Sequence, residues 1–471
     1  MLKAHTFVYK LFSGIAFKML YLSLALLSFN AFTYYQPWMK YLVLLVTLFG
    51  AINCFYRLIN YKKFIKTPYL ALGLLFLTSY LLTIVINIRF GLSESFQGLI
   101  WMSFQILMLY CFDMEKPLED QENEFRRIGT IFVIYTSLAC LAGLTMLYLN
   151  YGELYVVSKE IIVPRGFVWG RLWGVFTDPN YGSVSVCLSM ILCIYYFRNT
   201  NIKIIKILIA ISMTVSFFYL VFSDSRTGYV ALTCSLFVII YFMFSADKKP
   251  TTEKKSKKIL LHRVLPAIVS LFITIGTIGT AIATKEIYNY AISVHQVANP
   301  QNDKQIKRSS EVEETDLSNR RLSIWKSGLE IFEKSPVAGV GFRNIVAAAE
   351  EKAPDTYIIN NSFVKFNAFH NMWLDVLVSQ GIIGIVIFLA FTLCCLSAVI
   401  RSLLFIRKHK PENLRLFAVL LSSASVCLVS SLFLSDTVYV NTPNAVIFWI
   451  FLGYLMSIFN QSKKHNFQQS L

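Results

Sequence analysis

Apolar residues in this chain gather into long runs, and polar residues gather between the runs. A helix of roughly 20 apolar residues crosses the hydrocarbon core of a bilayer. We identify about twelve runs of this kind, at residues 19–35, 41–59, 68–87, 96–112, 128–150, 181–197, 204–222, 228–244, 259–284, 372–400, 416–434 and 445–459. The pattern predicts an all-α polytopic membrane protein with about twelve transmembrane helices.

The amino-acid composition agrees with this prediction. Of the 471 residues, 56% are hydrophobic and 15% are charged, and the mean hydropathy is +0.56. Soluble domains carry about 25% charged residues, so a conventional cytosolic enzyme, a secreted disulfide scaffold and a disordered protein are excluded. The nine cysteines lie in or beside the apolar runs, which favours small core residues over a disulfide framework.

The charge distribution predicts the orientation. The chain has 44 Lys and Arg against 27 Asp and Glu, a formal net charge of +17. Most of these cations fall in alternate connections, on the side that also holds both termini. Because cytoplasmic loops of membrane proteins are rich in Lys and Arg, we expect both termini in the cytoplasm. The excess charge then reports orientation, and we expect no nucleic-acid partner.

We expect four regions along the chain. They are an N-terminal group of five spans, a middle group that opens with an aromatic outer loop, a large extracytoplasmic loop, and three final spans with a cytoplasmic tail, at residues 1–150, 151–284, 285–370 and 371–471. The first half of the large loop is polar, so we expect it to be mobile, with the acidic run at 311–316 as solvated charge.

The second half of the large loop predicts helices. Leu322, Trp325, Leu329 and Phe332 recur at helical spacing, which predicts an amphipathic helix lying along the membrane interface. We expect Ser318 or Asn319 to cap this helix and Pro336 to end it. A second helix is predicted near residues 344–352.

Ionisable residues near the membrane are candidates for function because charge is costly there. Arg226 lies in the polar segment 223–227 between two apolar runs, so we expect it at the outer membrane boundary. Its guanidinium either grips a phosphate or pyrophosphate or pairs with Asp224 and reaches to the interface. Arg321, at the start of the amphipathic helix, is either a second anion ligand or an ordinary interfacial cation.

Three further residues are candidates on position alone. Arg165 and Arg171 alternate with tryptophans in the outer loop, a pattern typical of sugar-phosphate binding or of an aromatic membrane belt. His370 directly precedes an apolar run. An imidazole at that position is either a general base at neutral pH or a structural residue.

Several other chemistries lack their motifs. The sequence has no GxxxxGK[ST] phosphate loop, no HExxH zinc motif and no GxSxG elbow. We therefore expect no cofactor and no catalytic metal.

Four segments occur in order on the predicted outer face. They read GRLWGVFTDPN, SDSRTG, RLSIWKSGLEIFEKSPVAGVGFRN and FHNMWLDVLVSQGIIGIVIFL. Together, over roughly residues 165–387, the chain resembles the bacterial O-antigen ligase and O-unit polymerase superfamily of membrane glycosyltransferases. The resemblance implies a C-type glycosyltransferase fold in the bacterial inner membrane. It also implies a donor glycan on undecaprenyl pyrophosphate and an inverting, metal-independent transfer on the outer face.

The same resemblance assigns roles to individual residues. It implies that Arg226 and Arg321 hold the donor pyrophosphate and that His370, in the family's HN element, activates the acceptor hydroxyl. Asn180 falls in the family's PN turn, next to Asp178, which departs from the pattern of many members. Four residues are expected to bind substrate, namely Arg165, Arg171, Asn180 and Asn371.

We therefore predict an enzyme that polymerises undecaprenyl-pyrophosphate-linked repeat units into a capsule, an exopolysaccharide or an O-antigen. The alternative is a ligase that moves the glycan to lipid A core, teichoic acid or protein, and the motifs do not separate the two. A transporter of polysaccharide or lipid-linked sugar would bind near the bilayer midplane, so candidates at the outer boundary favour an enzyme. The resemblance implies a lipid-linked donor, a glycan acceptor, membrane lipid, a flippase and a chain-length regulator as partners.

Overall fold

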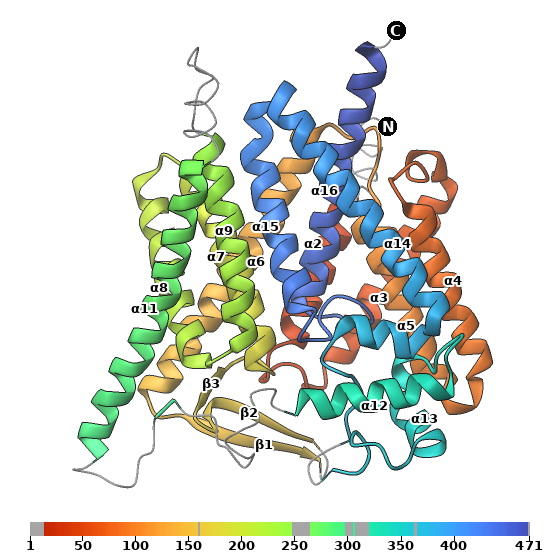
Figure 1. Ribbon diagram of the computed structural model, residues 1–471, viewed down its shortest axis with the longest axis horizontal. Coiled ribbons are helices and arrows are strands. Elements are labelled where there is room, and N and C mark those ends of the chain that lie inside the picture. Colours follow the sequence, from red (N-terminus) through yellow and green to blue (C-terminus); the bar gives the residue numbers. More distant parts are fainter. Residues whose placement is uncertain are drawn as a thin grey trace.

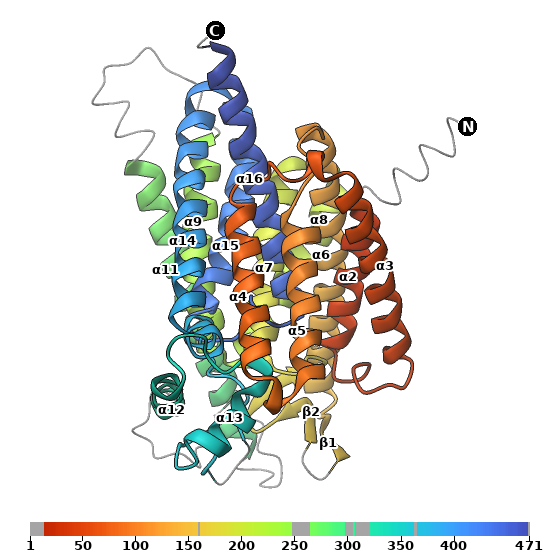
Figure 2. The same cartoon turned by 90° about the vertical axis from the view of Figure 1, so that its right-hand side faces the viewer.

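The computed structural model describes residues 14–158, 161–246, 264–296, 305–306, 320–361 and 365–469. Helices run back and forth as an antiparallel bundle, and a small sheet and short helices gather at one end of it (Figures 1 and 2). We name this the loop end. It carries β1 (Gly152–Ser158), β2 (Ile161–Val168), β3 (Arg171–Gly174), α12 (Arg321–Lys334), η5 (Phe342–Asn344) and α13 (Ile345–Lys352).

Within the described residues, each predicted apolar run overlaps a helix of the bundle. In chain order these helices are α2 (Ile15–Ser28), α3 (Met39–Ile59), α4 (Leu70–Ile86), α5 (Leu92–Phe104) continued by the π-helix η3 (Gln105–Tyr110), α6 (Leu118–Tyr148), α7 (Pro179–Asn199), α8 (Lys203–Ser223), α9 (Arg226–Ala246), α11 (Leu265–Gln296), α14 (Met372–His409), α15 (Leu414–Ser430) and α16 (Pro443–Gln469). Short 3-10 helices join some of them, namely η1 (Tyr61–Lys63), η2 (Ile88–Phe90) and η6 (Pro411–Asn413).

The all-α polytopic prediction is confirmed. Within the described residues, nine helices are long and apolar enough to cross a membrane, and α2 and α4 are shorter apolar helices. The apolar segment of α16 is 89% buried and that of α7 is 72% buried, whereas those of α3 and α11 are only 22% buried. The core therefore runs through α7 and α16. The exposed faces of α3 and α11 carry large apolar side chains such as Phe55 and Phe272, for which lipid is the favourable solvent.

The expected aromatic loop at residues 151–179 contains a three-stranded antiparallel sheet. β1 pairs with β2 from Gly152↔Gly166 onward, and β3 pairs only with the last residues of β2. Trp169 and Gly170 turn the chain between β2 and β3, and both have positive φ, 53° and 67°, as a two-residue hairpin loop requires. Pro164 lies inside β2, where sequence reading disfavours a strand, and the sheet was not expected.

The described parts of the large loop are mostly helical. α11 continues through residues 285–296, and Lys285 pairs with Asp224 at 2.8 Å, which ties this extension to the end of α8. The acidic run 311–316 and the proposed caps Ser318 and Asn319 lie outside the described residues. α12 ends at Lys334, just before Pro336 as predicted, and α13 confirms the second helix.

α14 is broken near its start, and the break holds part of the large loop. Gly381, in the first third of the helix, has φ 63°. The carbonyls of Val378 and Ser379 accept the N–H groups of Val340 and Gly341, at 3.0 and 2.9 Å. Broken helices inside membrane proteins are tolerated where other protein groups satisfy the freed carbonyls. The kink therefore anchors the segment that leads into η5.

Candidate active site

Arg226 lies in the first turn of α9, directly after a sharp reversal of the chain. α8 ends at Ser223, and Asp224 has a left-handed backbone with φ 47°. Ser225 Oγ accepts the N–H of Gly228 at 3.1 Å, which caps the first turn of α9. The side chain of Arg226 is exposed at a helix N-terminus, where backbone N–H groups also favour an anion.

Two of the residues predicted to bind substrate support this reversal. Arg171 Nε donates to the carbonyl of Ser223 at 2.8 Å, and its Nη2 donates to Asn180 Oδ1 at 2.9 Å. The same oxygen of Asn180 accepts from Ser225 Oγ at 3.2 Å. Arg171 and Asn180 therefore hold the backbone that presents Arg226.

Arg226 and Arg321, which lie far apart in the sequence, line one pocket at the loop end. Arg321 begins α12, and its Nη2 donates to Thr227 Oγ1 at 3.4 Å. The pocket has a volume of about 220 Å³ and is lined by Arg226, Thr227, Val230, Arg321, Leu322, Trp325 and Phe433. We name it the cation pocket. Two guanidiniums beside an apolar wall suit a ligand that is anionic on one side and apolar on the other.

The backbone before His370 is held from two sides. Phe369 donates its N–H to Asp375 Oδ1 at 2.8 Å, and Trp325 Nε1 donates to the Phe369 carbonyl at 3.0 Å. Ser435 Oγ donates to the second oxygen of Asp375. His370 has φ 51°, a conformation that costs a non-glycine residue roughly 1–2 kcal/mol. These hydrogen bonds therefore fix the position of His370 relative to α12.

Opposite charges act on the His370 ring. Burial lowers the pKa of His370 below its ordinary value of 6.5, Arg321 lowers it further, and Asp178 raises it. The ring is therefore largely neutral near pH 7, the form that accepts a proton. Asp178 is held in place because its Oδ1 accepts the N–H groups of Asn180 and Tyr181, at 2.7 and 3.2 Å, as the N-cap of α7.

Asn371 and Arg165 make structural contacts. Asn371 Oδ1 accepts two backbone N–H groups in the first turn of α14, at 3.0 and 3.2 Å. Arg165 donates to the carbonyl of Ala31 through two nitrogens, at 3.2 and 2.9 Å, and pairs with Glu153 at 3.4 Å. Its guanidinium also lies 3.7 Å from the ring centre of Tyr155. Arg165 thus fastens the sheet to the connection after α2, and it does not line the cation pocket.

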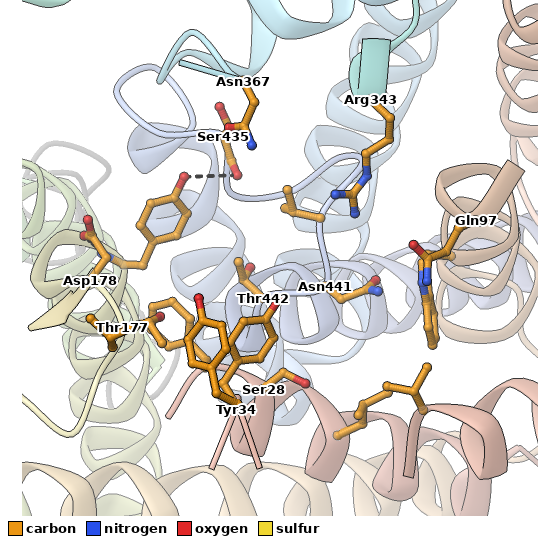
Figure 3. Close-up of a pocket in the computed structure, with 18 of the residues that line it drawn as sticks. Ser28, Tyr34, Gln97, Thr177, Asp178, Arg343, Asn367, Ser435, Asn441 and Thr442 are labelled. Atoms are coloured by element: carbon orange, nitrogen blue, oxygen red, sulfur yellow. Dashed lines mark hydrogen bonds between the residues drawn. The ribbon is translucent and has the colours of Figure 1, made fainter. Parts of the chain in front are cut away.

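A larger cavity opens beside Asp178 (Figure 3). Its volume is about 670 Å³, within the usual range for small-molecule sites. We name it the polar cavity after its polar lining, which includes Tyr34, Gln97, Asp178, Tyr181, Arg343, Asn367, Ser435 and Asn441. Asp178 lines this cavity and Arg321 lines the cation pocket. Trp325, in the wall of the cation pocket, donates to the carbonyl of Phe369. Phe369 is also joined through Asp375 to Ser435, which lines the polar cavity, so His370, the next residue, lies between the two sites.

Sequence reasoning missed the polar cavity because its lining comes from short segments spread over most of the chain. Gln97 lies in α5, Arg343 in η5 and Asn441 in the connection between α15 and α16. None of these segments carries a motif with a known chemistry. The available signal was Arg343, in the stretch GVGFRN, where two glycines mark a close approach of the backbone.

Comparison with known protein families identifies a match over part of the chain. Residues 211–389 match the family model described as O-Antigen ligase. The matched segment contains Arg226, Arg321, His370 and Asn371, and it ends beyond the kink of α14. A search of curated proteins returned no match.

Proposed function

Since the chain belongs, through residues 211–389, to the O-antigen ligase and O-unit polymerase superfamily of membrane glycosyltransferases, we propose that it is a polymerase. It joins oligosaccharide repeat units carried on undecaprenyl pyrophosphate and so builds a capsule, an exopolysaccharide or an O-antigen. One observation carries this proposal. Arg226 and Arg321 line one pocket, and Trp325 in the wall of that pocket donates to the carbonyl of Phe369, the residue before His370.

The cation pocket suits the pyrophosphate of the donor. As the bond between the anomeric carbon and the pyrophosphate oxygen breaks, negative charge grows on the leaving group. Two fixed guanidiniums stabilise that charge without rearranging. Among the residues that the structure describes, no group of three His, Cys, Asp or Glu is placed to hold a metal ion. The proposed transfer draws its positive charge from Arg226 and Arg321.

His370 is the proposed general base. The acceptor hydroxyl approaches from the polar cavity, its oxygen attacks the anomeric carbon, and its proton passes to the neutral imidazole. The carbon–oxygen bond to pyrophosphate breaks in the same displacement, and lipid pyrophosphate leaves into the cation pocket. Attack from the face opposite to the leaving group inverts the anomeric centre.

An apolar groove lies farther along α9 from the cation pocket and suits the lipid of the donor. One face of this helix carries, at successive intervals of about one turn, Arg226, Val230, Thr233 and Phe237. Val230 lines the cation pocket, whereas Thr233 and Phe237 line a groove of about 750 Å³ between α9 and α11. The lining of the groove is almost entirely apolar, so a polyprenyl chain can follow it while the pyrophosphate stays with the arginines.

We propose that the loop end faces the outside of the bacterial inner membrane and that both termini are cytoplasmic. Among the described residues, Lys- and Arg-rich connections such as those at residues 60–66 and 407–415 lie at the end opposite to the sheet (Figure 1), which agrees with the positive-inside rule. On that face the enzyme would receive units from a flippase and would act with a chain-length regulator.

The test uses purified protein in lipid nanodiscs with its native lipid-linked repeat unit. We expect a ladder of products on undecaprenyl lipid, formed with a chelator present and without nucleotide sugar. Dependence of the reaction on a nucleotide sugar or on added metal would contradict the mechanism.

The description of the matching family favours a second function, that of a ligase. A ligase would transfer the glycan to lipid A core, teichoic acid or protein, and it would leave the lipid-linked unit unextended when that acceptor is absent. Analysis of the product's reducing-end carrier therefore separates the two activities.

A further inference from the structure

Arg343 projects into the polar cavity from an anchored piece of backbone. Phe342, just before it, is buried and stacks on Tyr439, with ring centres 4.9 Å apart and ring planes 13° apart. Asn344, just after it, is 2% exposed, and its Oδ1 accepts from Ser95 Oγ at 3.0 Å. The side chain of Arg343 is nevertheless exposed. Both neighbours hold the backbone in the protein, and the guanidinium is left to face the cavity.

The surroundings of this guanidinium leave it available to a ligand. Arg343 is the one cation among the described residues that line the polar cavity. Figure 3 shows it on the side of the cavity that also carries Gln97 and Asn441, across from Asp178. No ion pair joins Arg343 to a carboxylate of the described chain, and the carboxylate of Asp178 is committed to the first turn of α7.

We propose that Arg343 binds an acidic group on the acceptor glycan, a carboxylate or a phosphate, so that the repeat unit of this enzyme is acidic. The inference rests on the proposed function. A guanidinium keeps its charge at every physiological pH, and its planar fork matches the two oxygens of a carboxylate or phosphate. In a partly enclosed cavity, water screens the attraction less than it does at an open surface.

The position of Arg343 suits a residue that selects the acceptor glycan and does not take part in the chemical step. In the proposed mechanism the attacking hydroxyl lies at the end of the cavity that holds Asp178 and Ser435, toward His370, whereas Arg343 lies across the cavity from Asp178. The acidic group is therefore on a sugar, or a sugar substituent, away from the reacting hydroxyl. Tyr34, a residue that is 46% exposed and lines the same cavity, offers an apolar ring face to a sugar. Loss of Arg343 should weaken acceptor binding and leave donor binding unchanged.

The experiment uses the native repeat unit in two forms. The lipid-linked unit serves as donor, and the oligosaccharide released from its lipid by mild acid serves as a molecule that can only accept. Mass spectrometry of the released unit tests for the acidic group. One sample of acceptor is then carboxyl-reduced and another is treated with phosphatase, so that the treatment that neutralises the acceptor identifies the group as carboxylate or phosphate.

Three variants are compared with the wild type in nanodiscs. Arg343→Gln removes the charge, Arg343→Lys keeps it without the fork, and Arg89→Gln is the matched control. Arg89 is also exposed at the loop end, where it pairs with Glu351 at 2.6 Å, and it does not line the polar cavity.

We expect Arg343→Gln to raise the acceptor KM about tenfold to a hundredfold, as the loss of a charged hydrogen bond predicts, with the donor KM unchanged. The acceptor KM of Arg343→Lys should lie between those of Arg343→Gln and the wild type, and the acceptor KM of Arg89→Gln should equal that of the wild type. The KM of the wild type for neutralised acceptor should equal the KM of Arg343→Gln for native acceptor. Arg343→Gln itself should have the same KM for both acceptors.

Two results would overturn the inference alone, while the wild type still elongates. One is a native repeat unit without an acidic group, and the other is an unchanged acceptor KM in Arg343→Gln. A wild-type protein that makes no ladder would refute the proposed function first, and the inference with it. An unchanged donor KM in Arg343→Gln also shows that the variant is folded.

Discussion

Replacing Trp325 by Phe removes one hydrogen bond and keeps an aromatic ring in the wall of the cation pocket. The indole Nε1 of Trp325 donates to the carbonyl of Phe369 at 3.0 Å, and Phe369 is fully buried. A buried carbonyl that loses its donor costs about 1–3 kcal/mol. Because the next residue, His370, is held at φ 51°, we expect the segment to relax and the imidazole to lose its alignment.

The expected result is a fall in kcat of about tenfold, since 1.4 kcal/mol corresponds to a factor of ten. The donor KM should change little because Arg226 and Arg321 keep their side chains. The pH profile gives a second readout. The rate depends on neutral His370, so it rises with pH through the pKa of that group. Burial holds this pKa below 6.5 in the wild type. An imidazole that is less buried in the variant should have a higher pKa, which shifts the acidic limb of the profile to higher pH.

Trp373 provides the matched control. Its indole Nε1 is buried and has no hydrogen-bond partner among the described residues, so Trp373→Phe removes an indole N–H that donates to nothing. Steady-state kinetics of both variants, with thermal melting to check folding, test the reasoning. Equal kcat values and equal pH profiles for Trp325→Phe and Trp373→Phe would refute a positioning role for Trp325.

Three further predictions follow from the site and the groove. Arg226→Gln and Arg321→Gln should each lower kcat/KM for the donor about tenfold to a hundredfold, through loss of charged hydrogen bonds. Arg226→Lys and Arg321→Lys should keep part of the kcat/KM that the Gln variants lose. Unchanged donor kinetics would argue against the cation pocket. Gly279→Leu should raise the KM for a long-chain polyprenyl donor but not for a short-chain analogue, because Gly279 lines the groove and faces open space. Gly276→Leu is its control, since Gly276 also faces open space but does not line the groove, and equal effects on both donors would exclude the groove. Arg171→Gln should lower the melting temperature as well as kcat, because it removes two hydrogen bonds that hold the reversal before Arg226; a fall in kcat with unchanged melting would indicate direct contact with substrate.

Much of the fold could be predicted from the sequence, because a bilayer demands long apolar helices whatever their neighbours are. Within the described residues the predicted apolar runs therefore overlap helices, and Pro336 marked the end of α12. The sheet at residues 152–174 escaped prediction, since its strands gain stability from pairing with each other and with the connection after α2. The extension of α11 to Gln296 escaped for the same reason, because Lys285 finds its partner, Asp224, on another helix.

The sequence by itself determined which residue types were available for the chemistry and which end of the helices carried them. It singled out Arg226, Arg321 and His370 from their places beside apolar runs and from a family resemblance. Only the tertiary structure brought the two arginines into one pocket, made Arg171 and Asn180 supports of the turn before Arg226, and placed Arg343 in a polar cavity. The physical reason is that helical spacing is a local property, whereas a binding site is made by side chains whose segments meet through packing.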